Sequence, residues 1–150
     1  MKYLIDFITN TPLWAAVAAW AIAQVLKVFV VLIAEKKFDI ANLFASGGMP
    51  SSHSAFVTAL CTVIGINEGL GSPIFAIAAA FALVVMYDAC GVRRAVGEQA
   101  KVLNKIIQGM NEKNVENSQE VLKVILGHSP FQVAMGWIVG LVTGLLFALI

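Results

Sequence analysis

The sequence predicts an all-α integral membrane protein with about four transmembrane helices and a cytoplasmic helical hairpin. Of its 150 residues, 59% are apolar and only 13% are charged. A soluble domain carries roughly 25% charged residues, so this chain has too few to cover a solvated surface. The mean hydropathy is +0.85, and several apolar stretches approach the roughly 20 residues that a helix needs to span a bilayer.

The same figures exclude disordered, collagenous and disulfide-stapled chains. The net charge is only +1, whereas nucleic-acid-binding domains are typically strongly basic, so the charge does not indicate nucleic-acid binding. Cys61 and Cys90 lie inside apolar runs, so we expect buried free thiols, not a disulfide framework. The chain is therefore expected to form a single membrane domain, residues 1–150.

Four apolar stretches are candidate spans. They cover residues 12–34, 50–66, 73–92 and 130–150. Backbone polar groups in lipid must be satisfied internally, which favours helices. The second stretch is short and begins with polar residues, so we expect it to start inside a protein-lined cavity. The first is too long for a signal peptide and lacks a clear cleavage site, so we treat it as a retained span.

The segment of residues 95–127 predicts a helical hairpin. Val96, Ala100, Leu103 and Ile107 recur at helical spacing, which is typical of an amphipathic helix. A short second helix is expected over residues 119–126. An ordinary packed hairpin and a membrane-surface hairpin both fit this pattern.

The distribution of basic residues predicts the topology. Four spans place both termini on one side, together with Lys2 alone. The loops on the other side, residues 35–49 and 93–129, carry eight lysines and arginines. The positive-inside rule places these loops in the cytoplasm, and both termini outside.

Both histidines of the chain lie at junctions between a cytoplasmic loop and a span. His53 lies in the segment Gly-Gly-Met-Pro-Ser-Ser-His-Ser, residues 47–54, and His128 in Leu-Gly-His-Ser-Pro, residues 126–130. The two therefore share one depth at one membrane face. This pairing favours a functional site over two unrelated interfacial side chains.

The segment before His53 has the features of an anion site. Its two glycines let the backbone approach a ligand closely, and Pro50 suits the first turn of a helix. The N–H groups of Ser51, Ser52 and His53 would then point outward, where a helix N-terminus attracts phosphate. A plain helix cap is the competing interpretation.

Three further sites carry charge near the same face. Arg93 and Arg94 suit two-pronged phosphate binding, or anchor the third span. Asp88 is an ionisable residue within a span, which is a functional hypothesis by default; it would orient a histidine or form an ion pair with Arg94 or Lys27. Lys27 either snorkels to the interface or points with Gln24 into the bundle, where it would neutralise phosphate.

The last span carries Gly136, Gly140 and Gly144 in two overlapping Gly-x-x-x-Gly units. Small residues at this spacing let helices pack closely. The partner is left open: another span of this chain, or a second copy in a homo-oligomer.

The segments at residues 47–54, 88–94 and 126–130 together resemble the divergent branch of the phosphatidic acid phosphatase type 2 superfamily, which is related to vanadium haloperoxidases. The resemblance covers essentially the whole chain. Members of this superfamily hydrolyse phosphate esters through a phosphohistidine, and the resemblance implies no metal and no other cofactor. It implies a membrane phosphatase acting on a lipid phosphate or diphosphate.

The resemblance also implies residue roles. Residues 50–53 match the Pro-Ser-Gly-His motif with Ser52 replacing glycine, which makes His53 the general acid. His128 matches the nucleophile, Arg93 or Arg94 the phosphate-binding arginine, and Lys27 the motif lysine.

The chain departs from the family pattern in several ways. A polar hairpin separates the arginines from His128, and the chain has fewer spans than six-helix members. Gln132 stands where an orienting carboxylate is expected, so either Asp88 takes that role or catalysis is weak or absent. The alternative is a non-catalytic protein that binds or transports a phosphorylated lipid, and a third interpretation is a scaffold whose polar residues only pack helices.

Overall fold

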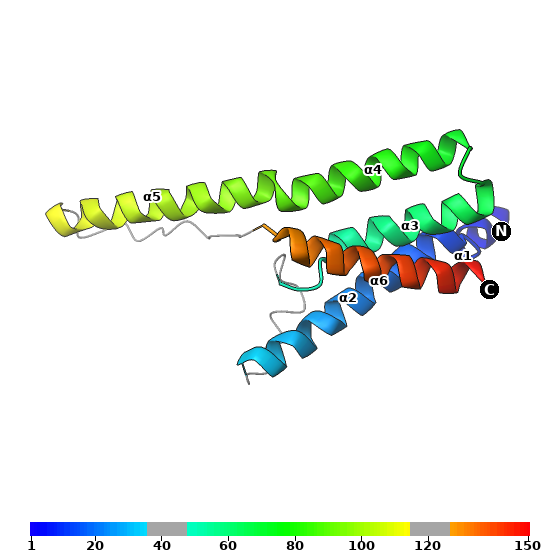
Figure 1. Cartoon of the computed structure of the whole chain (residues 1–150), viewed down its shortest axis with the longest axis horizontal. Coiled ribbons are helices and arrows are strands. Elements are labelled where there is room, and N and C mark those ends of the chain that lie inside the picture. Colours follow the sequence, from blue (N-terminus) through cyan, green and yellow to red (C-terminus); the bar gives the residue numbers. More distant parts are fainter. Residues whose placement is uncertain (36–47, 115–126) are drawn as a thin grey trace.

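The computed structural model describes residues 1–35, 48–114 and 127–150, and these residues form helices joined by short turns (Figure 1). The prediction of an all-α protein is confirmed. The helices are α1 (Lys2–Ile8), α2 (Thr11–Glu35), α3 (Ser52–Glu68), α4 (Pro73–Cys90), α5 (Val92–Asn114) and α6 (Pro130–Ala148).

Three helical stretches are long and apolar enough to cross a membrane: Thr11–Ile33, Pro73–Ile107 and Pro130–Ala148. They correspond to the first, third and fourth expected spans. The second expected span corresponds to α3, which has 17 residues.

Helix α3 lies at the centre of the bundle. It packs against α2, α4 and α6, whereas α2 and α4 do not contact each other within the described residues. Eight of its residues, from Ser52 near its start to Gly65 near its end, are buried. The polar start of the short second stretch is thus packed against protein, as we expected.

Small residues hold the bundle together. Ala19 and Ala23 of α2 meet Ala55 and Ala59 of α3, and all four are fully buried. Alanine faces let helix axes approach closely, which replaces the hydrophobic driving force that is missing in lipid.

The glycine stripe of α6 packs against α3 of the same chain. A Cβ atom added at Gly136 would collide with the carbonyl oxygen of Ser51, and one at Gly140 with that of Ala55. The partner left open by the sequence is therefore α3. The alternative prediction, a homo-oligomer interface through this stripe, is wrong, because α3 of the same chain already packs against it.

Serines begin three of the helices. Ser51, Ser72 and Ser129 are the N-caps of α3, α4 and α6, and each side chain accepts a hydrogen bond from the backbone N–H three residues later. Pro73 and Pro130 follow their caps directly, where the missing N–H costs nothing. These local signals set where the helices begin.

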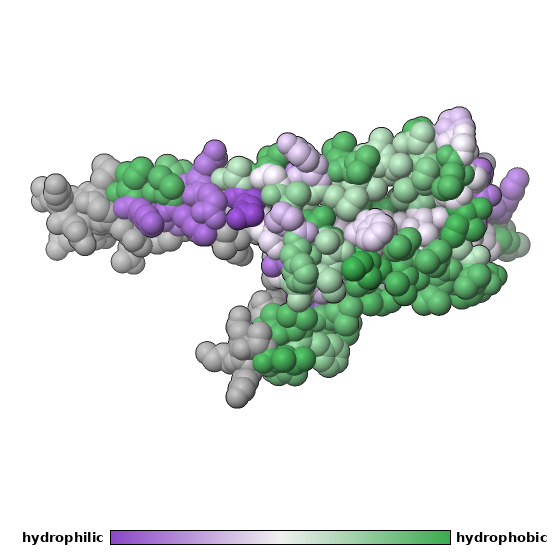
Figure 2. All heavy atoms as spheres, in the orientation of Figure 1, coloured by the Kyte–Doolittle hydropathy of each residue, from purple (hydrophilic) through white to green (hydrophobic). Residues whose placement is uncertain are grey.

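Helix α5 continues the direction of α4 past the rest of the bundle (Figure 1). The expected amphipathic helix over residues 96–107 forms the middle of α5. Val96 and Leu103 are exposed, and Figure 2 shows apolar and hydrophilic surface side by side along this helix. The expected second helix of the hairpin, residues 119–126, lies outside the described residues.

Both termini lie at one end of the bundle (Figure 1). The starts of α3 and α6, which carry His53 and His128, lie at the other end. This arrangement matches an even number of passes, while the assignment of that end to the cytoplasm stays a prediction.

Candidate functional site

The two histidines meet at the end of the bundle that carries the helix starts. The ring centroids of His53 and His128 are 6.0 Å apart, with 65° between the ring planes. His53 belongs to the first turn of α3, and His128 precedes the N-cap of α6. Residues 75 positions apart in the chain therefore form one pair.

Backbone hydrogen bonds hold the segments that carry this pair. The N–H of His128 donates to the carbonyl oxygen of Ala89 in the last turn of α4 (2.9 Å), and the N–H of Ser51 donates to that of Gln132 (3.0 Å). The starts of α3 and α6 and the end of α4 are thereby tied together. His128 is only 1% exposed, so its position is set by packing on all sides.

Gln132 sets the protonation pattern of the His128 ring. Its Oε1 atom accepts a hydrogen bond from the backbone N–H of Ser129 at 3.1 Å, and an N–H can only donate, so this atom is the amide oxygen and not the nitrogen. The same oxygen lies 3.2 Å from Nδ1 of His128. Nδ1 must therefore carry the proton, which leaves the lone pair of the neutral ring on Nε2.

The Nε2 atom of His128 is buried and makes no hydrogen bond within the described part of the chain. Buried polar atoms are normally satisfied, and an exception calls for an explanation. An unpartnered, proton-free ring nitrogen beside a second histidine is suited to attack or bind an electrophilic ligand atom.

Burial lowers the pKa of His128 below its ordinary value, because the charged ring is poorly solvated there. The hydrogen bond that the ring donates to Gln132 and the backbone of Gly48 act in the opposite direction, while the nearby charges of His53 and Lys27 add to the lowering. His128 is therefore neutral at neutral pH.

Lys27 points into the protein and does not snorkel. It is 1% exposed, and its Nζ donates to Oε1 of Gln24 at 2.7 Å. A Cβ atom at Gly48 would lie 3.2 Å from Cγ and Cδ of Lys27, and Gly48 has a φ of +87°. The glycine segment thus passes directly over the lysine stem, and the charge of Lys27 lies near enough to His128 to lower its pKa.

The start of α3 differs from the expectation. Pro50 precedes the N-cap Ser51 and does not occupy the first turn. The expected outward N–H of Ser51 is taken by Gln132, and its hydroxyl oxygen accepts from both the N–H and the hydroxyl of Ser54. The N–H groups of Ser52 and His53 remain in the first turn, where the helix supplies no acceptor.

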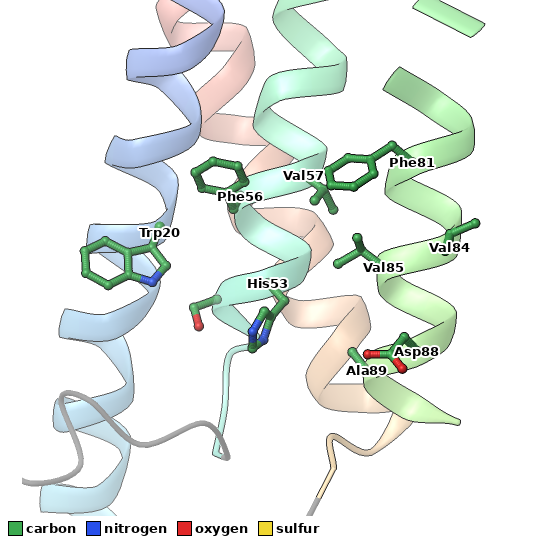
Figure 3. A pocket seen from close by; sticks show the side chains of 10 residues that line it. Trp20, His53, Phe56, Val57, Phe81, Val84, Val85, Asp88 and Ala89 are labelled. Atoms are coloured by element: carbon green, nitrogen blue, oxygen red, sulfur yellow. The ribbon is translucent and has the colours of Figure 1, made fainter. Parts of the chain in front are cut away.

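Asp88 lies near His53, while the side chain that bonds Nδ1 of His128 is Gln132. Asp88 and His53 line the same end of a groove (Figure 3). Arg94 is exposed on the first turn of α5 and is not among the residues that line this groove. The side chain of Arg93 lies outside the described part of the structure.

The groove runs away from His53 between α2 and α4, over the surface of α3 (Figure 3). Its volume is about 520 Å³. Apart from the end at Ser52, His53 and Asp88, its lining is apolar.

One contact at this candidate site was missed in the sequence although its signal is local. Ser129 and Gln132 form a capping box, and serine followed three residues later by glutamine is readable as such a motif. From the sequence alone, Gln132 was noted only because it stands where the family pattern has an orienting carboxylate. The structure shows that the capping geometry delivers its oxygen to His128.

Comparison with known proteins gives two matches that span the chain. The model of a family described as "Divergent PAP2 family" matches residues 8–143. The chain is 42% identical over 153 aligned positions to a Bacillus subtilis (strain 168) protein named "Uncharacterized membrane protein YuiD", covering 95% of this chain and 97% of that one. No solved structure matches.

Proposed function

The chain is an integral membrane protein of the divergent PAP2 family, and we propose that it hydrolyses a lipid phosphate or diphosphate through a phosphohistidine on His128. The observation that carries the proposal is the bare Nε2 atom of His128. It is buried without a hydrogen bond, its lone pair follows from the Gln132 contact, and it lies beside a second histidine.

The proposed reaction has two steps. Nε2 of His128 attacks phosphorus, the bond from phosphorus to the leaving oxygen breaks, and protonated His53 donates its proton to that oxygen. Water then attacks the phosphohistidine, His53 takes the proton from the water, and the phosphorus–nitrogen bond breaks. Phosphate leaves, and both rings return to their starting protonation states.

In this mechanism, Lys27 and the start of α3 stabilise the negative charge on the transferred phosphoryl group. The ammonium of Lys27 lies close enough to lower the pKa of His128, and the first-turn N–H groups of α3 belong to a helix N-terminus, which favours anions. Cations and N–H groups held in place before the reaction stabilise the transition state more than mobile water does. Ser51 serves this site as the cap that holds the α3 start, and Ser52 is the serine that lines the groove.

The test is His128→Asn, because the asparagine amide can still reach Gln132 while the nucleophile is lost. Purified protein in detergent is incubated with a panel of lipid phosphates, and phosphate release is measured. We expect turnover to disappear while binding of a lipid phosphonate persists, since a covalent route is worth far more than one ligand contact of about 1 kcal/mol. Wild-type turnover by His128→Asn would overturn the proposal.

A second variant tests the acid. His53→Gln is expected to impair hydrolysis of a lipid monophosphate more than that of a diphosphate, because a phosphate leaving group needs less protonation than an alcohol. Equal loss on both substrates would contradict the role of His53 as general acid.

A non-catalytic protein that binds phosphorylated lipid is the alternative, and the neutral amide of Gln132 is the observation that favours it. A carboxylate would stabilise the imidazolium that forms during phosphoryl transfer, and an amide does so less well. Phosphonate binding without phosphate release from any lipid of the panel would support this alternative.

A further inference from the structure

Helix α5 carries an apolar face beyond the bundle, and α4 is the only helix of the described residues that α5 contacts. We propose that this face binds the α5 helix of a second copy of the chain, so that two copies pair in parallel outside the membrane. The proposal concerns assembly, and it does not depend on the chemistry proposed for the histidine pair.

Helix α5 leaves the bundle at the membrane face where the neighbouring span begins. The N–H of His128, two residues before α6, donates to the carbonyl oxygen of Ala89 near the end of α4, so α4 and α6 reach the same face. The helical stretch from Pro73 to Ile107 has 35 residues, which is about 52 Å at 1.5 Å per residue, while a hydrocarbon core is about 30 Å thick. Most of α5 therefore stands beyond the core, where water surrounds its apolar face.

The apolar face of α5 has the pattern of a helix that packs on another helix. With Val92 as position a of a seven-residue repeat, the a, d and e positions up to Ile106 are apolar with one exception, Gln99. Such a pattern is typical of a packed helix, and contiguous apolar surface in water marks an interaction site. Figure 2 shows the apolar surface along one side of this helix. Its five large side chains are 48% to 57% exposed and are those of Val92, Val96, Val102, Leu103 and Ile106.

The direction of α5 argues against the membrane surface as the cover of this face. A helix bound to a membrane surface lies in the plane of the interface, whereas α5 continues the direction of α4 (Figure 1). Backbone hydrogen bonds run across the joint, since the N–H of Gly91 donates to the carbonyl oxygen of Tyr87 at 2.8 Å and that of Ala95 to Gly91 at 3.0 Å. The joint thus holds α5 along the direction of a membrane-spanning helix and away from the lipid.

The one polar residue on the face suits a parallel pair. Two copies with the same topology send α5 out of the same membrane face, so equal positions of the repeat meet. Gln99, which is exposed, then meets its own counterpart at the middle a position. A single polar residue at an a position fixes the register and the number of helices in a coiled coil, whereas the same amide buried in lipid would lose its hydrogen bonds.

The charges of α5 allow two copies to approach. The basic side chains with defined positions lie about 180–220° around the helix from Val92, at 3.6 residues per turn, and are Arg94, Lys101 and Lys105. Across two helices that are each about 10–12 Å wide, the two basic sides are farther apart than the screening length of about 8 Å. Lys101 also has a partner on its own helix, Glu98 at 3.1 Å. Repulsion between the copies is therefore weak.

Disulfide trapping in isolated membranes tests the pairing. In a chain with Cys61 and Cys90 replaced by alanine, Gln99→Cys or Ile106→Cys places a single thiol at an a position. The control, Lys101→Cys, places it on the opposite side of the same helix. We expect mild oxidation to give covalent dimers at both a positions and less than about a tenth as much with the control, because a disulfide needs Cα atoms within about 7 Å of each other. No dimer at either a position, or as much dimer with Lys101→Cys, would overturn the proposal.

A second measurement follows association without a cross-link. Energy transfer between donor-labelled and acceptor-labelled copies is recorded in liposomes as the ratio of lipid to protein is raised. Leu103→Glu places a charge on the apolar face, and we expect it to weaken association at least about tenfold. Lys101→Glu places the same side chain on the opposite side and should associate as the wild type does. Wild-type association of Leu103→Glu would refute the pairing.

Other covers of the face would give different results. A monomeric protein in which a nitroxide on Leu103→Cys is relaxed by oxygen dissolved in lipid would assign the face to the membrane. A monomeric protein in which that thiol is shielded from both dissolved oxygen and a water-borne thiol reagent would assign it to another part of the same chain. Either result would overturn the second copy as the partner of α5.

Discussion

Replacing Gln132 by glutamate exchanges an amide for a carboxylate at the atom that contacts His128. Glutamate is also favoured at this position of a capping box, so the hydrogen bond to the N–H of Ser129 is expected to persist. Gln132 is half-buried, so a carboxylate there keeps part of its hydration. The substitution therefore changes the charge opposite Nδ1 of His128 with little cost to the fold.

The size of the effect follows from the 3.2 Å contact between Nδ1 of His128 and Oε1 of Gln132. A neutral hydrogen bond contributes about 1 kcal/mol, and one to a charged group about 1.5–3 kcal/mol. The additional stabilisation of the imidazolium is thus on the order of 1.4 kcal/mol. This corresponds to a rise of about one unit in the pKa of His128 and to about tenfold in rate, because positive charge develops on the ring as it takes up phosphorus.

The two consequences act in opposite directions along the pH axis. At a pH well above the pKa of His128 in both proteins, the ring is neutral in each, and Gln132→Glu is expected to be about tenfold faster. On acidification, the glutamate variant is expected to lose activity first, because His128, the proposed nucleophile, has the higher pKa there and takes up its proton at a higher pH. The acid limb of kcat/KM should therefore move up by about one unit.

Two measurements check this reasoning. Phosphate release is followed from pH 5 to pH 9 for both proteins, with Asp88→Asn as the comparison for a carboxylate near His53. Nitrogen NMR on ¹⁵N-histidine protein shows only two rings, assigned with His53→Gln. It should report a proton on Nδ1 and none on Nε2 of His128, whether or not the protein turns over substrate.

A proton on Nε2 of neutral His128 in the wild-type protein would refute the role of Gln132. An acid limb and rate unchanged by Gln132→Glu, together with loss of activity in Asp88→Asn, would transfer the orienting role to Asp88. Either result would show that the contact between Gln132 and His128 does not control the nucleophile.

Three further predictions follow from other contacts. Gly140→Ala should lower the free energy of unfolding by about 1–3 kcal/mol, measured by thermal unfolding, because its Cβ collides with Ala55. The control is Gly71→Ala, whose Cβ would have no atom within 4 Å and which should change stability by less than about 0.5 kcal/mol. Equal melting temperatures for the two variants would contradict the packing of α6 on α3. Because the pKa of His128 is lowered in the folded protein, the unfolded chain binds more protons below about pH 6.5, so the melting temperature should fall with acidification from that pH, and the fall should shrink in His128→Asn. In a background lacking both native cysteines, an impermeant thiol reagent on intact cells should label Glu68→Cys and not Lys105→Cys; the reverse would invert the expected orientation.

Much of the architecture was readable in the sequence because its signals are local. Hydropathy located the spans, since lipid acts on each segment separately. The histidine segments could be placed at one membrane face because four passes put every second junction on the same side. The helix over residues 96–107 was predicted from periodicity alone, which depends only on neighbours along the chain.

Other features depended on which helices pack together, and periodicity carries no information on that choice. Gly140 was expected at a close helix contact, but only the fold shows that Ala55 of α3 is its partner. For Lys27, snorkelling and inward pointing fit the sequence equally well, and burial under Gly48 decided between them.

The site itself was decided by tertiary structure. From the sequence, Gln132 stood out only because the family pattern has a carboxylate at its position. In the fold, the junction of α3, α4 and α6 directs its side-chain oxygen to Nδ1 of His128, and Nε2 of that ring makes no hydrogen bond within the described residues. Residue type determined which groups were available for chemistry. Their protonation and direction follow from hydrogen bonds and burial between segments far apart in the chain, and these exist only once the bundle has packed.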